Sequence, residues 1–525
     1  MPSSSESDAS STPSSTHMRD SMIHVPPPRP FVSEGAGMLP STLTSPTRSV
    51  VELSFQTATF SKNNSFNVIP VPSSALQQSD SATPASAPVA TALTHVTNVK
   101  VNILPAVIGY FGYIFGCAIS AFYSLILKER SFSPQMVGVL IAIIPLFSLT
   151  LLPVLSYMAD KYRATTSMLT CCAVISVITV LPFTLVSSKH LLILVFIIIQ
   201  ASCCPMNPLL DQHTLLMFPK EGRSTSWSYV RSFGAYGWGI GCVVGSVAVE
   251  FVQRWYVLAF QYALGQAALL YCIFTTKPYE KAERTPVRFF DVLRLLKKSP
   301  RVLLFLFAAC LMGMGYSFIN NFLFMFLDDL GGNKVLMGFT VLLTVSTEVP
   351  LFQMSERLLH KFTERQMMSM AMLIWVLRVV GYSLLTNAWQ VLLLEPLHGV
   401  TFAFMWLPSV HVLSKAFPPH LSSSATGVLF MFSGGVGPFV GNLVAGALYS
   451  ELGPRMMFRV AASVMLVGFF IYQGVDRMLE RRGVPLFGSM GVDAVVMREE
   501  EKMRSEGFNG GRKHIPPNSE ELPPL

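Results

Sequence analysis

From Val99 to about Arg477 the chain is a succession of apolar runs, each roughly twenty residues long and separated from the next by a short polar segment. A run of about twenty apolar residues crosses roughly 30 Å of hydrocarbon as an α-helix. Twelve such runs follow one another, so the pattern predicts an all-α membrane protein with twelve transmembrane helices. The expected spans are 101–127, 134–158, 165–186, 190–217, 228–249, 254–275, 302–327, 335–356, 365–386, 389–414, 424–448 and 455–476.

The composition agrees with the pattern. Of the 525 residues, 51% have apolar side chains and only 13% are Asp, Glu, Lys or Arg, whereas soluble domains carry about 25% charged residues. These values exclude a soluble enzyme and a nucleic-acid-binding module. The net charge of +8 comes from basic residues in short loops, where they indicate membrane orientation. All eight cysteines lie in apolar runs without Cys-x-x-Cys spacing, which predicts reduced, structural thiols.

Polar segments divide the chain into five parts. Residues 1–98 are rich in Ser, Thr and Pro, which predicts a disordered tail, and their first residues lack the basic and apolar regions of a signal peptide. The longest connection in the membrane region is basic and separates six crossings from six. The expected parts are a tail at 1–98, a six-helix bundle at 99–275, a linker at 276–300, a second six-helix bundle at 301–478 and a charged tail at 479–525.

Lys and Arg are unequally shared between the two sides of the membrane. Most of those in the short loops fall on one side, as Lys161, Lys220 and Lys361 do, and fewer fall on the other, as Lys128 and Lys334 do. The excess marks the cytoplasmic side. An even number of crossings then predicts that both termini, and the linker, are cytoplasmic.

The two halves match when the second is moved back by 200 positions, with no gap over about forty residues. A duplicated six-helix half is typical of transporters built from parallel repeats. The matches are Phe122 with Phe322, Leu127 with Leu327, Gly138 with Gly338, Leu151 with Leu351 and Lys161 with Lys361.

The twelve crossings and the charged loop after the second one resemble the major facilitator superfamily. That loop, Ser156-Tyr157-Met158-Ala159-Asp160-Lys161-Tyr162-Arg163, is similar to the family's G-x-x-x-D-R-x-G-R element, with Ser156 and Arg163 in place of its glycines. The resemblance implies that the charges of Asp160 and Lys161 bias the contact between helices in the two transport states.

Further motifs resemble one branch of the superfamily, which contains lactose permease, the nucleoside–proton symporters and the domain-containing-6 group. The segment Arg231-Ser232-Phe233-Gly234-Ala235-Tyr236-Gly237-Trp238-Gly239 is similar to the R-x-W-G-S-x-G-W element of that branch. The other matches are Asn207-Pro208-Leu209-Leu210-Asp211, Glu348-Val349-Pro350, Arg378 and Glu395-Pro396-Leu397-His398-Gly399.

Polar groups within the crossings are the candidate site, because a charge facing lipid costs at least about 2.5 kcal/mol on insertion scales. Asn207 and Asp211 share one helix face that can hydrogen-bond a solute. An alternative role for Asp211 is a structural ion pair with Arg231. The residues expected to bind the solute are Asn207, Asp211, Arg231, Trp238, Asn320 and Asn321.

A second group is expected to couple transport to protons. Glu395 and His398 are three apart on one face, and a carboxylate beside an imidazole can exchange a proton near neutral pH. Glu348 and Arg378 lie on neighbouring crossings. An equally weighted alternative is that Arg378 merely neutralises Glu395 while His398 packs against a helix.

These observations predict a secondary active transporter for a small polar solute such as a sugar, a nucleoside or a related organic molecule, with the proton as coupling ion. The chain lacks a G-x-x-x-x-G-K-S/T phosphate loop, and no enzymatic activity, cofactor, metal or nucleic-acid partner is expected. A facilitative uniporter, a non-transporting sensor or scaffold, and a channel remain alternatives. The solute, the membrane and the oligomeric state stay open.

Overall fold

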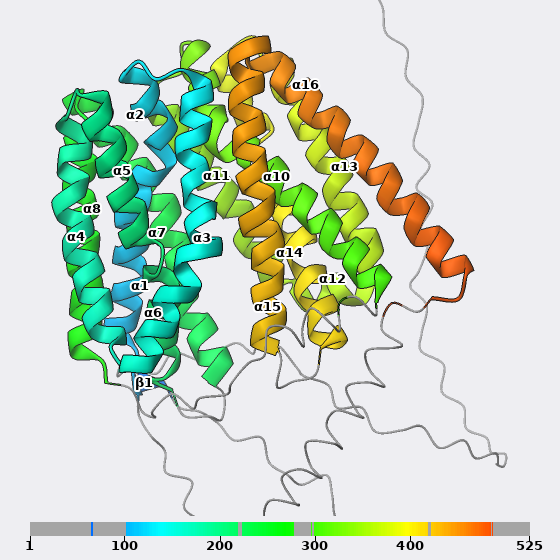
Figure 1. Cartoon of the computed structure of the whole chain (residues 1–525), viewed down its shortest axis with the longest axis horizontal. Coiled ribbons are helices and arrows are strands. Elements are labelled where there is room, and N and C mark those ends of the chain that lie inside the picture. The colour runs from blue at the N-terminus through cyan, green and yellow to red at the C-terminus, as the bar shows by residue number, and fades with distance from the viewer. Residues whose placement is uncertain are drawn as a thin grey trace, which may run out of the picture. The chain divides into compact units, whose positions relative to one another are not determined.

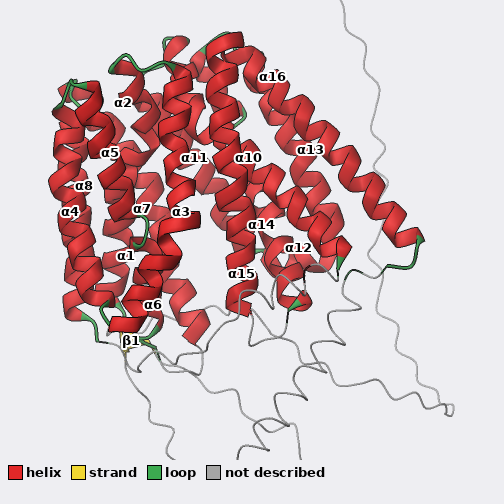
Figure 2. Ribbon diagram, in the orientation of Figure 1, coloured by secondary structure: helices red, strands yellow, loops and turns green. Residues whose placement is uncertain are grey.

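The computed structural model describes residues 65–66, 101–218, 223–277, 296, 299–417, 422–484 and 486. Most of the predicted N-terminal tail, most of the linker and most of the predicted C-terminal tail lie outside these residues. The described part is almost entirely helical (Figure 1, Figure 2). Its two short strands, β1 (Ser65–Phe66) and β2 (Val101–Asn102), pair antiparallel just before the first crossing.

The helices follow the predicted spans closely. The first half contains α1 (Leu104–Gly116), η1 (Cys117–Phe122), α2 (Tyr123–Glu129), α3 (Pro134–Tyr162), α4 (Thr165–Leu185), α5 (Lys189–Cys203), α6 (Met206–Leu215), α7 (Arg223–Val252) and α8 (Tyr256–Thr275). The second half contains α10 (Pro300–Asp329), α11 (Lys334–Gln353), α12 (Ser355–Lys361), α13 (Glu364–Ser383), η2 (Ala388–Leu393), α14 (Pro396–Ala416), α15 (Ser422–Phe430), η4 (Met431–Val436) and α16 (Gly437–Arg481).

Eleven helical segments of the described chain are long and apolar enough to cross a membrane, and the last of them makes two crossings. This segment, Thr426–Arg481, is 56 residues long. It turns back at Gly453, whose φ of 78° and ψ of 167° are not helical and favour glycine. Its two legs are visible in Figure 1 as α16, and they complete the twelve predicted crossings.

Local signals explain where several helices begin and break. The Ser133 hydroxyl accepts a hydrogen bond from the Met136 amide at the start of α3. Asn333 caps α11 in the same way, 200 positions further on. The fourth crossing is interrupted at Pro205, between α5 and α6, because proline lacks the N–H that would continue the helix.

The predicted repeat places two glycines at matching contacts between the halves. α3 packs on α16, and α11 packs on α7. A Cβ atom on Gly138 would lie 2.5 Å from the carbonyl oxygen of Asn442, and one on Gly338 would lie 2.7 Å from that of Cys242. The partners are themselves 200 positions apart, so both interfaces are the same contact, made once by each repeat.

One end of the molecule carries charges that join the two halves. The Lys128 Nζ atom at the end of α2 lies 2.5 Å from Asp328 Oδ2 and 2.7 Å from Asp329 Oδ1 at the end of α10. The Lys334 Nζ atom at the start of α11 lies 3.4 Å from Glu129 Oε1. These five residues form what we term the interbundle ion cluster, which links the two halves at this end.

Candidate solute site between the two bundles

A cavity of about 600 Å³ lies between the two halves and draws its walls from both. A volume of roughly 300–1,000 Å³ is typical of small-molecule sites. The first half contributes α1, η1, α2, α3 and α5 to α8, and the second contributes α10, α11, α13 and α14. The sequence-predicted residues that line the cavity are Asn207, Trp238, Asn320, Asn321, Arg378, Glu395 and His398.

Asp211 and Arg231 are not among the residues that line the cavity. The Asp211 Oδ1 atom accepts hydrogen bonds from the Tyr110 hydroxyl at 2.6 Å and from Arg231 Nε at 3.2 Å. The Tyr110 hydroxyl in turn accepts a hydrogen bond from Trp227 Nε1 at 3.1 Å. This network includes the Asp211–Arg231 ion pair that the sequence offered as an alternative role for Asp211, and the solute-binding role of both residues stays a prediction.

Arg378 is the buried charge at the centre of the second-half wall. Its side chain is 1% exposed, and Nη2 donates to Glu395 Oε2 at 2.9 Å. The Tyr382 hydroxyl donates to the other Glu395 oxygen at 2.6 Å. Both Glu395 oxygens are therefore occupied, as a buried carboxylate requires. Glu395 lies between η2 and α14, where Pro396 starts the next helix.

His398 contacts the guanidinium of Arg378. Nη1 of Arg378 lies 2.7 Å from His398 Nδ1. A guanidinium has only donors, so Nδ1 must be the acceptor, and this contact requires the neutral imidazole with its proton on Nε2. The guanidinium is thus bonded to both Glu395 and His398, which the sequence had placed side by side as one proton pair.

Aromatic rings pack against His398 and continue along α14. The His398 and Phe402 rings stack with centroids 6.2 Å apart, and Phe402 and Trp406 stack at 6.0 Å. Tyr316 from α10 meets the His398 ring edge-on at 5.6 Å. This packing restricts rotation of the imidazole and keeps its Nδ1 atom directed at Arg378.

The first-half wall carries no formally charged side chain among its lining residues. It contains Gln200, which is 6% exposed and whose Nε2 atom has no hydrogen-bond partner in the described part of the protein. The Cys203 sulfur lies 3.3 Å from the Tyr262 hydroxyl. Sequence analysis missed Gln200, although an amide that interrupts the apolar run of α5 was a usable signal. It also missed Tyr113, Cys117, Ser120, Tyr123, Ser148, Cys203, Cys204 and Tyr262.

The two asparagines of α10 differ in their contacts. The Asn321 Nδ2 atom donates to Asn442 Oδ1 of α16 at 2.8 Å, so this residue also ties two helices together. Asn320 is exposed, and it lines the cavity. Glu348 is half-buried on α11, is not a lining residue, and forms no ion pair with any residue that the structure describes.

The residues of the predicted conformational loop lie at the end of α3, outside the cavity lining. The Asp160 Oδ1 atom accepts a hydrogen bond from Gln212 Nε2 of α6 at 2.8 Å. The Lys161 Nζ atom lies 5.4 Å from the ring centre of Tyr162. Within the described ranges, no group of three or more His, Cys, Asp or Glu side chains could hold a metal ion.

Known proteins resemble this chain both in sequence and in fold. The model of the MFS_1 like family matches residues 108–460. The chain is 22% identical over 203 residues to a major facilitator superfamily domain-containing protein 6-like protein B of Xenopus laevis, covering 39% of this chain and 32% of that protein. It thus spans about a third of the length of this relative. It is also 22% identical over 339 residues to a maltose permease of Geobacillus stearothermophilus, covering 64% of this chain and 84% of the permease.

Solved structures show the same fold. The nucleoside transporter NupG superposes with a TM-score of 0.62 at 17% identity, covering 71% of this chain and 98% of that one. A bacterial homologue of the lysosomal transporter Spinster, in an inward-facing and unoccupied conformation, superposes with a TM-score of 0.56 at 13% identity, covering 72% and 97%.

Proposed function

Since the chain belongs to the MFS_1 like family of the major facilitator superfamily, we propose that it is a secondary active transporter that moves a small polar solute by alternating access. It is a multi-pass integral membrane protein with the fold of this superfamily. The observation that carries the proposal is the cavity between the two bundles, which combines an uncharged polar wall with a buried ionic one. Rocking of two repeats about a central site is the expected transport step.

The charge arrangement supports a solute without net charge. Arg378 and Glu395 neutralise one another, and His398 is neutral in the observed contact. While this pair is intact, an ionic solute would find no unpaired opposite charge in the cavity, so burying its own charge would be costly. Sugars and nucleosides carry many hydroxyl groups, and such groups match the amides of Gln200, Asn207 and Asn320.

Proton coupling is assigned to the ion pair in the second half. Protonation of Glu395 would remove its charge and weaken its hold on Arg378, whose guanidinium could then bind the solute. Solute binding and protonation would thereby favour the same state, which is the requirement for a symporter. Glu348 stays a candidate proton carrier on α11.

The proposed orientation places both termini in the cytoplasm. The interbundle ion cluster then lies at the outer end, and the structure is closed to the outside. The Asp160–Lys161 loop lies at the opposite, cytoplasmic end, where we expect its charges to bias the contact between helices.

The test is transport by purified protein in liposomes against a panel of neutral sugars and nucleosides, with and without an imposed pH gradient. In Glu395→Gln, uphill accumulation should be lost while counterflow of solute persists, because the amide keeps the size of the side chain and can still accept a hydrogen bond from Arg378 but cannot take up a proton. Glu364→Gln is the matched control, since Glu364 is a carboxylate at the start of α13 that pairs with His411 and does not line the cavity.

Three results would contradict parts of the proposal. Accumulation by Glu395→Gln equal to that of the unaltered protein would remove the coupling role of this pair. Flux that ignores the pH gradient in the unaltered protein would identify a facilitative uniporter. Absence of flux for every solute, with intact folding, would favour the sensor or scaffold alternative.

A further inference from the structure

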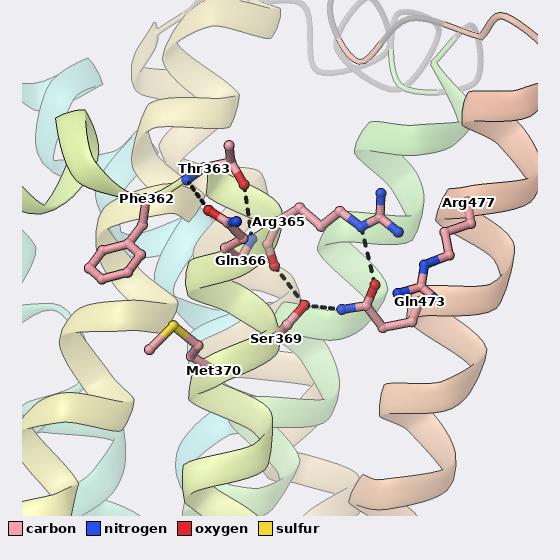
Figure 3. Close-up of a pocket in the computed structure, with 8 residues that line it drawn as sticks. All are labelled: Phe362, Thr363, Arg365, Gln366, Ser369, Met370, Gln473 and Arg477. Atoms are coloured by element: carbon pink, nitrogen blue, oxygen red, sulfur yellow. Dashed lines mark hydrogen bonds between the residues drawn. The ribbon is translucent and has the colours of Figure 1, made fainter.

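A second pocket lies away from the central cavity, between the ends of α13 and α16. It has a volume of about 480 Å³. Figure 3 shows its lining, in which Arg365 and Ser369 of α13 face Gln473 of α16, Arg477 lies one turn further along α16, and Gln366 turns toward Thr363. The proposed orientation places this pocket at the cytoplasmic surface of the membrane.

Hydrogen bonds hold the polar floor of this pocket in place. The Arg365 Nε atom donates to Gln473 Oε1 at 3.1 Å, and Gln473 Nε2 donates to the Ser369 hydroxyl. The Ser369 hydroxyl donates to the Arg365 carbonyl oxygen at 2.6 Å. Three polar side chains from two helices are thus fixed relative to one another (Figure 3).

Positive charge exceeds negative charge around this floor. Arg301 and Arg365 both bind the buried carboxylate of Asp476, each with a nitrogen within 3.1 Å of it. Glu480, which is 57% exposed, pairs with Arg365 at 2.7 Å. Arg477 is exposed and forms no ion pair with any residue in the described ranges. The pocket therefore offers one guanidinium that is available to an anion.

The same helix faces become apolar toward the membrane interior. On α13, Leu373 and Leu377 follow Met370 at three and seven positions and are 41% and 62% exposed. On α16, Phe470 and Leu466 precede Gln473 at three and seven positions and are 63% and 36% exposed. Residues three, four or seven apart share a helix face. The polar pocket therefore continues into an apolar strip formed by Leu373, Leu377, Leu466 and Phe470, which we term the apolar seam.

We propose that this pocket binds the phosphate-bearing headgroup of an anionic membrane lipid, with Arg477 as the principal phosphate ligand and the acyl chains along Leu377 and Phe470. Arginine forms paired hydrogen bonds to phosphate, and basic pockets between transmembrane helices on the cytoplasmic side suit such headgroups. A free phosphate would fit the polar floor equally well. The apolar seam is what favours a lipid.

The experiment uses the full chain, purified in detergent, and measures binding by native mass spectrometry. The probes are a short-chain phosphatidylinositol phosphate, a short-chain phosphatidylcholine and the soluble inositol phosphate headgroup. Arg477→Gln removes the free charge, and Arg481→Gln is the matched control, because Arg481 is an exposed arginine on the same helix that does not line the pocket.

The unaltered protein and Arg481→Gln should bind the anionic lipid more tightly than the neutral lipid and more tightly than the free headgroup. Arg477→Gln should bind it about fivefold more weakly, as expected for one basic residue at an anionic surface. An equal loss of lipid affinity in both variants would show that the lipid binds to a diffuse basic surface and not to this pocket. Equal binding of lipid and free headgroup, or no preference for the anionic lipid, would also overturn the proposal.

Discussion

The interbundle ion cluster makes a quantitative prediction about which transport state is populated. In Lys128→Met, the ammonium that contacts both Asp328 and Asp329 is lost while most of the aliphatic side chain is kept. The closed outer end loses two ion pairs at once, so the protein should shift toward the state that is open to the outside.

The exposure of the charged side chains sets the expected size of this shift toward the outward-open state. The Lys128 side chain is 26% exposed, and those of Asp328 and Asp329 are 34% and 40% exposed. Exposed ion pairs contribute about 0.2–1 kcal/mol each, and these are partly shielded from water. Losing both should cost about 1–2 kcal/mol, which corresponds to a rise of roughly 5- to 30-fold in the outward-open population relative to the closed one.

The native cysteines provide the assay. Cys117 lines the cavity, whereas Cys171 is exposed on α4 and does not. A membrane-impermeant maleimide is added to sealed vesicles on the side of Lys128, and peptide mass spectrometry measures the alkylation of each cysteine. The Cys117 rate should rise in Lys128→Met, and the Cys171 rate should stay constant.

A charge swap separates the ion pair from other effects of the substitution. Lys128→Asp combined with Asp328→Lys restores opposite charges and should return Cys117 alkylation most of the way to its original rate. If Lys128→Met leaves that rate unchanged, or if the swap alkylates as fast as Lys128→Asp alone, the cluster does not hold the outer end closed.

Two further predictions concern stability. Gly338→Ala should lower the free energy of unfolding by about 1–3 kcal/mol, because the new methyl would lie 2.7 Å from the Cys242 carbonyl oxygen. Gly474→Ala should be tolerated, because a Cβ atom there would have nothing within 4 Å. Equal melting temperatures of the two variants would contradict the close approach at Gly338. Arg378→Met should lower the free energy of unfolding by about 3–5 kcal/mol, because the buried carboxylate of Glu395 loses its partner. Asp211→Asn should lower it by less than about 1 kcal/mol, because Asp211 pairs with a half-exposed arginine. The melting temperatures of the two variants in the same detergent test this ranking.

The sequence predicted the crossings well because their determinant is the length of apolar runs, which the bilayer thickness sets. The predicted repeat also had structural content, since Gly138 and Gly338 lie at equivalent contacts between the halves. The sharp return at Gly453 was expected only as a gap between two runs.

Membership of the cavity was harder to predict. Lipid and protein interior are both apolar, so hydropathy does not reveal which side of a transmembrane helix faces inward. Asp211 and Arg231 were predicted as solute ligands from their polarity alone, and in this structure they pair with each other and are not among the residues that line the cavity. Tyr113 and Cys117 line the cavity but lie in an apolar run that gives no polar signal. The contact of Arg378 with Glu395 and His398 depends on the packing of α13 against α14.

The two repeats differ where each passes the cavity, and this difference bears on how a solute could open the outer end. α10 is one continuous helix, so Asn320 at the cavity and Asp328 in the interbundle ion cluster are eight residues, or about 12 Å, apart on one rigid element. At the equivalent positions of the first half, residues 117–122 form the 3₁₀ segment η1 between α1 and α2. A 3₁₀ stretch within a helix often marks a hinge. A solute that binds at Asn320 would therefore move Asp328 with it, because α10 is rigid between these two residues. In the first half, by contrast, α2 can bend away from α1 at η1. We expect the first crossing to absorb most of the bending when the cluster opens, and the seventh to transmit the motion.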